Sequence, residues 1–165
     1  MNGKLYLIAT PIGNLEDITL RAIRILNEVD LIAAEDTRHT LKLLNHLKIK
    51  KPLISYYKQN ENIKTEILIK KLLKGENIAL VSDGGTPGIS DPGEKIVKSA
   101  IANNIEIIPI PGACAAIVAA IVSGISIQEF SFIGFLPVNK KDKKEKLEKY
   151  STSKQTLIFM KHHIS

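Results

Sequence analysis

Short and almost wholly apolar runs, rich in β-branched residues, recur along the first two thirds of the chain. They cover residues 5–9, 29–34, 52–56, 78–82 and 105–110. Strands that are buried on both faces of a parallel sheet have continuous apolar runs, whereas strands with one exposed face alternate apolar and polar residues. The pattern therefore predicts five parallel strands.

Helical periodicity occupies the gaps between these runs. The apolar positions are Leu20, Ile23 and Leu26 in the first gap, Leu41, Leu44 and Leu47 in the second, Ile63, Ile67 and Leu68 in the third, and Ile96, Val97 and Ala100 in the fourth. Asn60 and Asp91, which precedes Pro92, are predicted N-caps, and Gly75 a left-handed C-terminal cap. Strands and helices that alternate in this way favour a doubly wound α/β fold with right-handed crossovers.

The last third of the chain predicts the start of a second domain. The alanine-rich residues 113–124 predict a helix that ends at Gly124, and apolar residues 130–135 and 156–160 predict two further strands. We place the boundary near residue 118. The expected domains are an amino-terminal α/β domain over 1–118 and an incomplete, smaller mixed α/β domain over 119–165.

The chain is basic, with 23 Lys and Arg residues, 17 Asp and Glu residues and a net charge of +6. Half of this excess lies in residues 140–149, where six lysines accompany three acids. One interpretation is a solvated helix with i,i+4 ion pairs, Asp142 to Lys146 and Glu145 to Lys149. The other is a surface that contacts nucleic acid.

Composition restricts the class of protein. With 165 residues, 44% hydrophobic and 24% charged, the chain is expected to fold around a packed core. No apolar run approaches the roughly 18 residues of a membrane span and no signal peptide is evident, so a cytoplasmic protein without membrane association is expected. Cys114 is the single cysteine, and the adjacent His162 and His163 do not have the spacing of ligands that converge on one ion. We therefore predict no disulfide and no metal site.

Candidate functional residues directly follow the predicted strands, because open parallel sheets bind ligands beyond the carboxyl ends of their strands. Gly13 lies in a tight turn after the first strand and lets the backbone approach a ligand. Glu35, Asp36 and Arg38 follow the second strand. They form either a structural ion pair beside a helix capped by Thr37, or an acid and base cluster that faces a substrate.

The segment SDGGTPGISDPG at residues 82–93 is the strongest signal. Its glycines and prolines exceed what a simple strand-to-helix crossover needs. The absence of a GK[ST] sequence argues against a P-loop, and acids without a lysine suit an uncharged or cationic ligand. After the fifth strand, Pro111 and Gly112 lead into a helix amino terminus that could bind a carboxylate. Cys114 lies there without a visible base that would make it a nucleophile.

Six segments occur in a characteristic order: TPIGNLEDIT (10–19), AEDTR (34–38), SYYKQNE (55–61), SDGGTPGISDPG (82–93), PGACAA (111–116) and FIGFLP (132–137). Together they resemble the tetrapyrrole methylase superfamily over residues 4 to about 159. The likeness is greatest to those members that methylate a cytidine ribose 2'-hydroxyl in small-subunit ribosomal RNA. After Phe159 the sequence departs from the family pattern, which continues for a long further stretch.

The resemblance implies an S-adenosylmethionine cofactor, a homodimer, and small-subunit ribosomal RNA or the ribosomal subunit as partner. The residues it places at the cofactor, together with their neighbours in the same loops, are Ile12, Gly13, Asp83, Gly84, Gly85, Thr86, Pro87, Cys114 and Ala115. Asp83 would offset the charge of the sulfonium or bind the ammonium group. By position, Glu35 or Asp36 would take or orient the hydroxyl proton, and Arg38 would hold a substrate phosphate.

Three functions stay open on the sequence. The first is RNA 2'-O-methylation. The second keeps the fold and cofactor but acts on a tetrapyrrole or another small molecule, which the basic charge and the TPIGN and AEDTR strings disfavour. The third is a binding-only or inactive fragment, because a cleft formed by two domains loses much of its binding free energy with one of them.

Overall fold

The computed structural model describes residues 1–161, which fall into two units. The first ends at Cys114 and the second begins at Ala115, four residues before the predicted boundary at 118. The reason is that helix α5 (Ala115–Val122) groups as a whole with the second unit. His162 and His163, weighed above as a metal site, lie outside the described residues.

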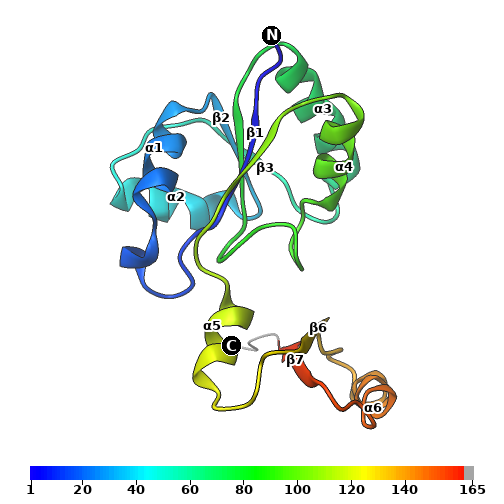
Figure 1. The fold of residues 1–165 in the computed structure, drawn as a ribbon. Helices are drawn as coiled ribbons and strands as arrows, with labels where there is room; N and C mark the ends of the chain where they lie inside the picture. Colours follow the sequence, from blue (N-terminus) through cyan, green and yellow to red (C-terminus); the bar gives the residue numbers. More distant parts are fainter. Residues whose placement is uncertain (162–165) are drawn as a thin grey trace. The chain divides into compact units, whose positions relative to one another are not determined.

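The first unit contains the predicted parallel sheet (Figure 1). Its order is β3 (Leu53–Ser55), β2 (Leu31–Ala34), β4 (Ile78–Val81), β1 (Leu5–Ile8) and β5 (Ile107–Ile110). Every neighbouring pair is parallel. Each strand is one or two residues shorter than its apolar run because the buried run continues past the strand, as at Val29 and Ile105.

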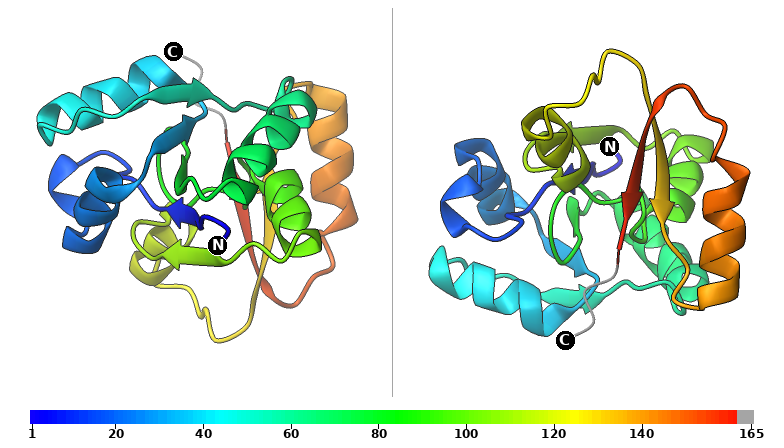
Figure 2. Two further views of the ribbon diagram at one scale, coloured as in Figure 1. Left: turned by 90° about the horizontal axis from the view of Figure 1, so that it is seen from above. Right: turned by 90° about the horizontal axis from the view of Figure 1, so that it is seen from below.

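Helices cover both faces of this sheet, which confirms the doubly wound prediction (Figure 2). Helices α1 (Leu20–Glu28) and α2 (Thr37–His46) pack on one face, and α3 (Glu61–Leu73) and α4 (Glu94–Ala102) on the other. A short 3-10 helix, η1 (Leu15–Asp17), precedes α1. In residues 1–161, each helix is too short or too polar to cross a bilayer.

The apolar stripes of three helices are rotated from the predicted positions. Leu20 is 86% exposed, Leu41 48% and Ile63 69%, whereas the residues that pack on the sheet are Ala22, Ile25 and Leu26 in α1, Leu43 and Leu44 in α2, and Leu68, Ile69 and Leu72 in α3. In α1 and α2 the predicted sets have i, i+3, i+6 spacing, and residues three apart drift around a helix of 3.6 residues per turn, so the first and last members of each set face different directions. The fourth helix buries Ile96 and Ala100 as predicted.

One predicted cap, Asp91, is wrong, and another, Asn60, is correct in position only. Helix α4 begins two residues later than predicted, with Gly93 instead of Asp91 at the N-cap, and the Gly93 N–H donates to the carboxylate of buried Glu61 at 3.0 Å. Asn60 stands at the N-cap of α3 but makes no capping hydrogen bond. Its side chain instead accepts from the Tyr57 N–H at 2.8 Å, and so fixes the turn between β3 and α3.

The second unit contains α5, β6 (Phe130–Phe135), α6 (Lys140–Lys149) and β7 (Thr156–Met160). The two strands have the predicted bounds, and the structure shows that they pair in parallel. A register shift lies between Phe132 and Gly134. The predicted pairs from Asp142 and Glu145 are not the ones that form in α6. Lys144 pairs with Glu148 at 3.7 Å, and Lys146 donates to the Phe135 carbonyl at 2.8 Å because its side chain reaches the end of β6.

Helices α2 and α3 end in the same hydrogen-bonded motif but with different residues at its left-handed position. After α2, the Ile49 N–H donates to the Leu44 carbonyl and the Lys48 N–H to the Asn45 carbonyl. After α3, Gly75 takes the place of Lys48, with φ of 96° compared with 57° for Lys48. Glycine adopts this conformation without steric penalty, whereas lysine does not.

We therefore expect Lys48→Gly to stabilise the chain by about 1 kcal/mol, because it relieves the left-handed strain after α2. The free energy of unfolding in urea measures the change. Gly75→Ala, at the equivalent position of α3, is the matched control and should destabilise by a similar amount. A Lys48→Gly chain that is less stable than the parent would contradict this account of the α2 terminus.

Candidate functional site

Strand β4 lies at the centre of the sheet and is the point at which the chain connections change face. The helices that follow its neighbours β1 and β2 pack on one face, whereas α4, which follows β4, packs on the other. The loops after β1, β2 and β4 therefore diverge at the carboxyl end of the sheet. In open α/β sheets this divergence creates the crevice in which ligands bind.

The loop at 82–93 is tied to the loop after β1 by paired backbone hydrogen bonds. The Thr10 N–H donates to the Gly85 carbonyl at 3.0 Å, and the Gly85 N–H donates to the Thr10 carbonyl at 2.9 Å. The buried Thr10 hydroxyl also donates to the Ser82 carbonyl at 3.2 Å. These bonds fold the loop back over the end of β1.

The same loop contacts the turn after β5. The Thr86 hydroxyl donates to the Ala113 carbonyl at 3.1 Å. Gly85 has a φ of 85°, and a Cβ atom there would lie 3.4 Å from the Ile12 side chain and 3.5 Å from the Ala113 carbonyl oxygen. The φ of Gly85 is what calls for glycine, because a Cβ atom there would make only ordinary van der Waals contacts with the two other loops.

Carboxylates gather where the loops after β2 and β4 meet. The Asp36 N–H donates to Asp83 Oδ1 at 3.0 Å, and the Asp83 N–H lies 3.5 Å from Glu35 Oε2. Burial, with the charges of Asp91 and Asp83, raises the pKa of Glu35 above its usual 4.5. Burial and the charge of Asp83 likewise raise the pKa of Asp91. This acidic edge (Glu35, Asp36, Asp83 and Asp91) is suited to a cationic group.

Asp36 differs from the other carboxylates because it is fully engaged. It caps α2 by accepting from the Arg38 N–H at 2.8 Å, and it pairs with the Arg38 guanidinium at 2.7 Å. These bonds lower the pKa of Asp36 well below its usual range. The residue that caps α2 is thus Asp36 and not Thr37, which is the first residue of the helix.

Thr40 adds a feature that the sequence did not reveal. Thr40 is 3% exposed. Among the described residues, its hydroxyl is the buried side-chain polar group that has no hydrogen-bond partner. A small pocket of about 30 Å³ lies there, lined in part by Thr40, His39, Ser82 and Asp83. A pocket of this size holds about one water or one ligand hydroxyl, so Thr40 is a polar group available to a ligand beside the acidic edge.

Six of the nine residues predicted to bind a cofactor divide into two groups. Ile12, Asp83 and Gly84 are exposed at the carboxyl end of the sheet, where a ligand could contact them. Gly85 and Pro87 are buried and Thr86 is partly buried, so these three fix the loop.

Three predicted positions contribute less to this arrangement. Gly13 has a φ of 149°, and a Cβ atom there would meet nothing within 4 Å, so its conformation and not close packing calls for glycine. Cys114 is partly exposed at the end of the first unit, and Ala115 belongs to the second. Their roles stay predictions.

Two contributors to the site were missed for identifiable reasons. Asp91 was interpreted as a helix cap, yet it faces the acidic edge because α4 begins only at Glu94. Thr40 lies one helical turn after Asp36, in a position that the structure buries. The available signal was a polar residue at a buried position of α2. The signal was obscured because the apolar face predicted for this helix is not the face that packs on the sheet.

The chain is similar to known proteins over most of its length. The family model described as "Tetrapyrrole (Corrin/Porphyrin) Methylases" matches residues 4–164. Proteins named "Ribosomal RNA small subunit methyltransferase I" are similar: that of Halalkalibacterium halodurans is 57% identical over 157 residues, which are 95% of this chain and 54% of the relative. That of Haemophilus influenzae is 53% identical, over 96% of this chain and 56% of the relative. The chain spans about half the length of the curated relatives it matches.

Solved structures agree on the fold. A conserved hypothetical protein from Aeropyrum pernix superposes with a TM-score of 0.68 at 15% identity, covering 83% of this chain and 48% of that one. Uroporphyrin-III-C-methyltransferase from Thermus thermophilus superposes with a TM-score of 0.62 at 23% identity, covering 82% and 61%. These likenesses confirm the α/β architecture.

The unpaired Thr40 hydroxyl leads to a prediction about stability. Thr40→Val should leave the free energy of unfolding unchanged or raise it by up to about 1 kcal/mol, because it removes a buried hydroxyl that has no partner while keeping the shape. Urea unfolding measures the change. Thr65→Val is the matched control, since the buried Thr65 hydroxyl is 2.9 Å from that of Tyr56, and it should destabilise. Equal destabilisation by both variants would show that the Thr40 hydroxyl is paired in the fold.

The raised pKa of Glu35 predicts a pH-dependent stability. Above pH 4.5 the unfolded chain releases the Glu35 proton while the folded chain retains it, so the contribution of this group to stability falls as pH rises through the raised pKa. Glu35→Gln should therefore gain stability relative to the parent between pH 4 and pH 7 in urea titrations. Glu66→Gln, an exposed acid on α3, controls for the lost charge. A difference that is independent of pH would contradict the raised pKa.

Proposed function

Because this chain belongs to the tetrapyrrole methylase family, whose model matches residues 4–164, we propose that it is part of an S-adenosylmethionine-dependent RNA 2'-O-methyltransferase. The proposed substrate is a cytidine ribose in small-subunit ribosomal RNA. Relatives that are about half identical carry a ribosomal RNA methyltransferase name, and this similarity supports the substrate class.

The acidic edge is the observation that carries the cofactor proposal. S-adenosylmethionine has a sulfonium and an ammonium group, and both are cations. Asp83 is exposed and directly follows the central strand, and the pKa of Glu35 and of Asp91 is raised in part by its charge. A cation bound there relieves this mutual repulsion, so the site favours a positively charged ligand.

The loop that follows β4 fits a cofactor that lies against backbone. Gly84 is exposed, and a Cβ atom on it would lie 3.3 Å from the Pro11 carbonyl oxygen. The hydrogen bonds from Thr10 and Thr86 hold the loop on both sides. We assign Ile12, Asp83 and Gly84 to direct cofactor contact, and Gly85, Thr86 and Pro87 to the support of the loop.

Glu35 is the better proton acceptor of the two acids that follow β2. The bound cofactor supplies an electrophilic methyl group, and the protein must align the ribose hydroxyl with it and accept the hydroxyl proton. A carboxylate with a raised pKa accepts a proton more readily near neutral pH, whereas the low pKa of Asp36 makes it a poor base. We therefore propose that a carboxylate oxygen of Glu35, Oε1 or Oε2, accepts the proton of the ribose hydroxyl.

Asp36 orients Arg38. The Asp36 carboxylate holds the Arg38 guanidinium by two hydrogen bonds, of 3.1 Å from Nε and 2.7 Å from the terminal nitrogen. The Arg38 side chain is nevertheless 88% exposed, so its remaining N–H groups are available to a phosphate at the end of the sheet. The homodimer and the cytoplasmic location implied by the resemblance stay predictions.

Cofactor binding provides the direct test. Calorimetric titration should show that Asp83→Asn weakens S-adenosylmethionine by about tenfold more than S-adenosylhomocysteine, because only the former carries the sulfonium charge. Asparagine keeps an oxygen that can accept from the Asp36 N–H. Asp30→Asn is the matched control, since Asp30 accepts from the Asn77 N–H at 2.7 Å at the opposite end of β2 and β4. Equal losses for both ligands would remove Asp83 from sulfonium recognition.

Methyl transfer to small-subunit ribosomal RNA separates the two acids. Both variants are compared in one assay that follows the transfer of a labelled methyl group from the cofactor to RNA. Glu35→Gln should lower turnover at saturating RNA, and Asp36→Asn should chiefly raise the RNA concentration that gives half of the maximal rate. Transfer of label to a tetrapyrrole in place of RNA would instead favour the small-molecule alternative. A folded chain that binds neither S-adenosylmethionine nor S-adenosylhomocysteine would favour the fragment interpretation.

A further inference from the structure

The net charge of the chain is concentrated in one segment. Residues 37–60 contain six of the 23 Lys and Arg residues and none of the 17 Asp and Glu residues. The rest of the chain therefore holds 17 of each sign and is neutral overall. Helix α6 has a net charge of +3 because three acids accompany its six lysines, whereas the segment 37–60 has a net charge of +6 because it contains no acid.

Helix α2 displays two of these charges, with a histidine, as a stripe. Arg38, Lys42 and His46 are four residues apart in sequence and all exposed, so they lie on one face of the helix. Arg38 is in the first turn, beside the acidic edge, and His46 is the last helical residue. A ten-residue helix is about 15 Å long, so the stripe leads from the candidate site toward the amino end of the sheet.

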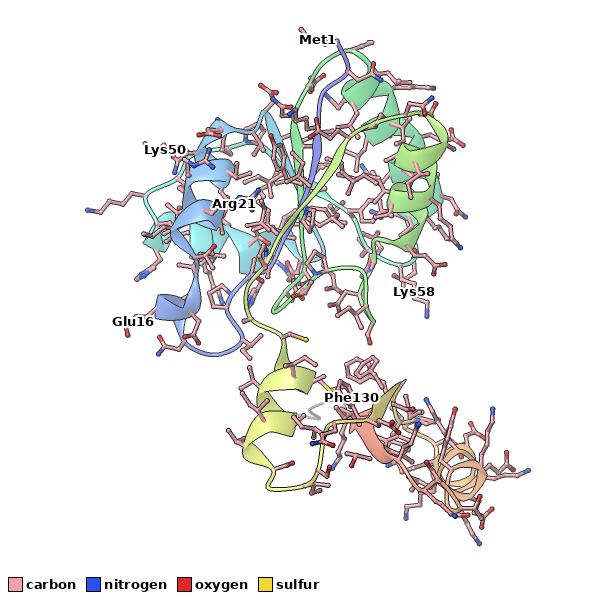
Figure 3. All side chains as sticks on the ribbon, viewed as in Figure 1. Met1, Glu16, Arg21, Lys50, Lys58 and Phe130 are labelled. Carbon is pink, nitrogen blue, oxygen red and sulfur yellow. The ribbon has the colours of Figure 1, made fainter. Side chains whose placement is uncertain are left out.

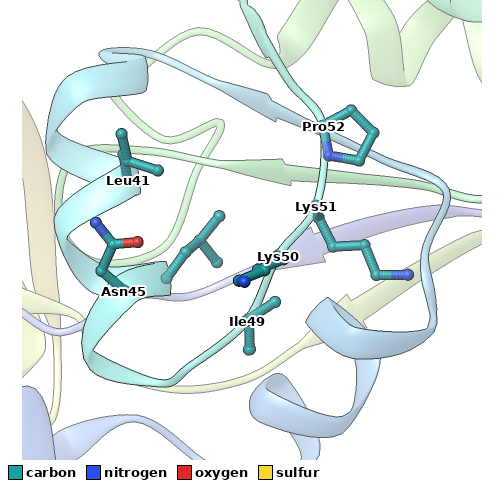
Figure 4. A pocket seen from close by; sticks show the side chains of 7 residues that line it. Leu41, Asn45, Ile49, Lys50, Lys51 and Pro52 are labelled. Atoms are coloured by element: carbon teal, nitrogen blue, oxygen red, sulfur yellow. The ribbon is translucent and has the colours of Figure 1, made fainter.

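The connection from α2 to β3 continues the charge at that end. Lys48 and Lys50 are exposed and Lys51 is half-buried, and Figure 3 shows Lys50 near the end of the sheet where the strands begin. A surface hollow of about 430 Å³ lies between α2 and this connection. Figure 4 shows Leu41 and Asn45 on its helix side, and Ile49, Lys50, Lys51 and Pro52 on the other.

Four lysines of this segment do not contribute ion pairs to the fold of residues 1–161. Among residues 1–161, the lysines at 42, 48, 50 and 51 form no ion pair, whereas Lys71 pairs with Glu76 and Lys98 with Glu94. Lys48 moreover occupies a left-handed position, with φ of 57°, that glycine would fill at lower conformational energy. Their charge is therefore available to a partner.

We propose that this basic α2 surface (Arg38, Lys42, His46, Lys48, Lys50 and Lys51) carries the phosphate backbone of the RNA away from the candidate site. The inference rests on the proposed function, since it assigns the RNA path at that same site. The four unpaired lysines, together with the exposed guanidinium of Arg38, are spread along a helix and beside a recess, and such a row of positive charge matches the regular charges of a nucleic acid. A membrane surface would be matched better by large exposed apolar side chains, and of the hollow's lining only Leu41 is a large hydrophobic residue that is clearly exposed.

Fluorescence anisotropy with a labelled ribosomal RNA stem-loop tests the surface. Lys42→Gln, Lys50→Gln and Lys51→Gln together should weaken binding about tenfold or more at low salt, and should reduce the slope of log affinity against log salt by about 2, because about three phosphate contacts are lost. The control replaces Lys140, Lys141 and Lys144 of α6 by glutamine, which removes the same charge. It should weaken binding by less than about twofold.

Lys48→Gly separates charge from folding. Since this substitution is expected to stabilise the chain, weaker RNA binding by it cannot be attributed to unfolding. Each variant should keep the parent's affinity for S-adenosylmethionine.

Three results would overturn the proposal. They are equal losses from the α2 and α6 variants, unchanged RNA binding by the α2 variant, and a loss by the α2 variant that appears only with phosphatidylserine vesicles, which would assign the surface to membranes. If the parent chain itself bound no RNA, the RNA substrate of the proposed function would fail, and the α2 surface with it.

Discussion

The paired backbone hydrogen bonds between Thr10 and Gly85 are the constraint on which the site depends. Strands β1 and β4 run parallel, yet beyond their carboxyl ends the chain after β4 turns back and pairs with Thr10 in the antiparallel sense. Gly85 permits the reversal because its φ is 85°. Once the loop is held there, Thr86 reaches the Ala113 carbonyl and Asp83 reaches the Asp36 N–H. These hydrogen bonds join the loops after β1, β2, β4 and β5 to one another, and the loops in turn position the candidate side chains.

Much of the fold could be predicted from the sequence because burial on both faces of a strand leaves a local mark. Continuous apolar runs predicted the five strands of the first unit. The two other strands within residues 1–161, Phe130–Phe135 and Thr156–Met160, have the predicted bounds although none of their residues is fully buried. Helix orientation leaves a weaker mark. Leu20 and Leu41 are apolar but exposed, and only packing against the sheet decides which side of a helix is buried. The start of α4 was likewise decided at a distance, since Glu61 on another helix binds the Gly93 N–H.

The location of the candidate site was more predictable than the roles of its residues. Parallel topology alone brings the residues after β2 and β4 to one edge, and the sequence therefore pointed to Glu35, Asp36 and Asp83. Adjacent acids cannot be told apart by sequence. Their difference arises from hydrogen bonds: Asp36 accepts from Arg38, which lowers its pKa, while Glu35 is partly buried near Asp83 and Asp91, which raises its pKa. The Thr40 hydroxyl was hidden for the same reason, because a buried unpaired group is defined by its surroundings.

A methyltransferase that acts on RNA, the function proposed for this chain, must combine two electrostatic tasks. Its cofactor is cationic and its substrate is a polyanion, so a single uniform potential cannot favour both. In this chain the carboxylates lie at the loops after β2 and β4, while the unpaired cations extend along α2 and into the connection to β3. The Asp36–Arg38 pair stands where the two regions meet. Its internal neutralisation lets opposite potentials approach within one turn of helix, and the exposed guanidinium still offers donors to a phosphate. Asp36, which caps α2, and Arg38, in the first turn of the helix, thus mark the transition from the proposed cofactor side to the proposed RNA side.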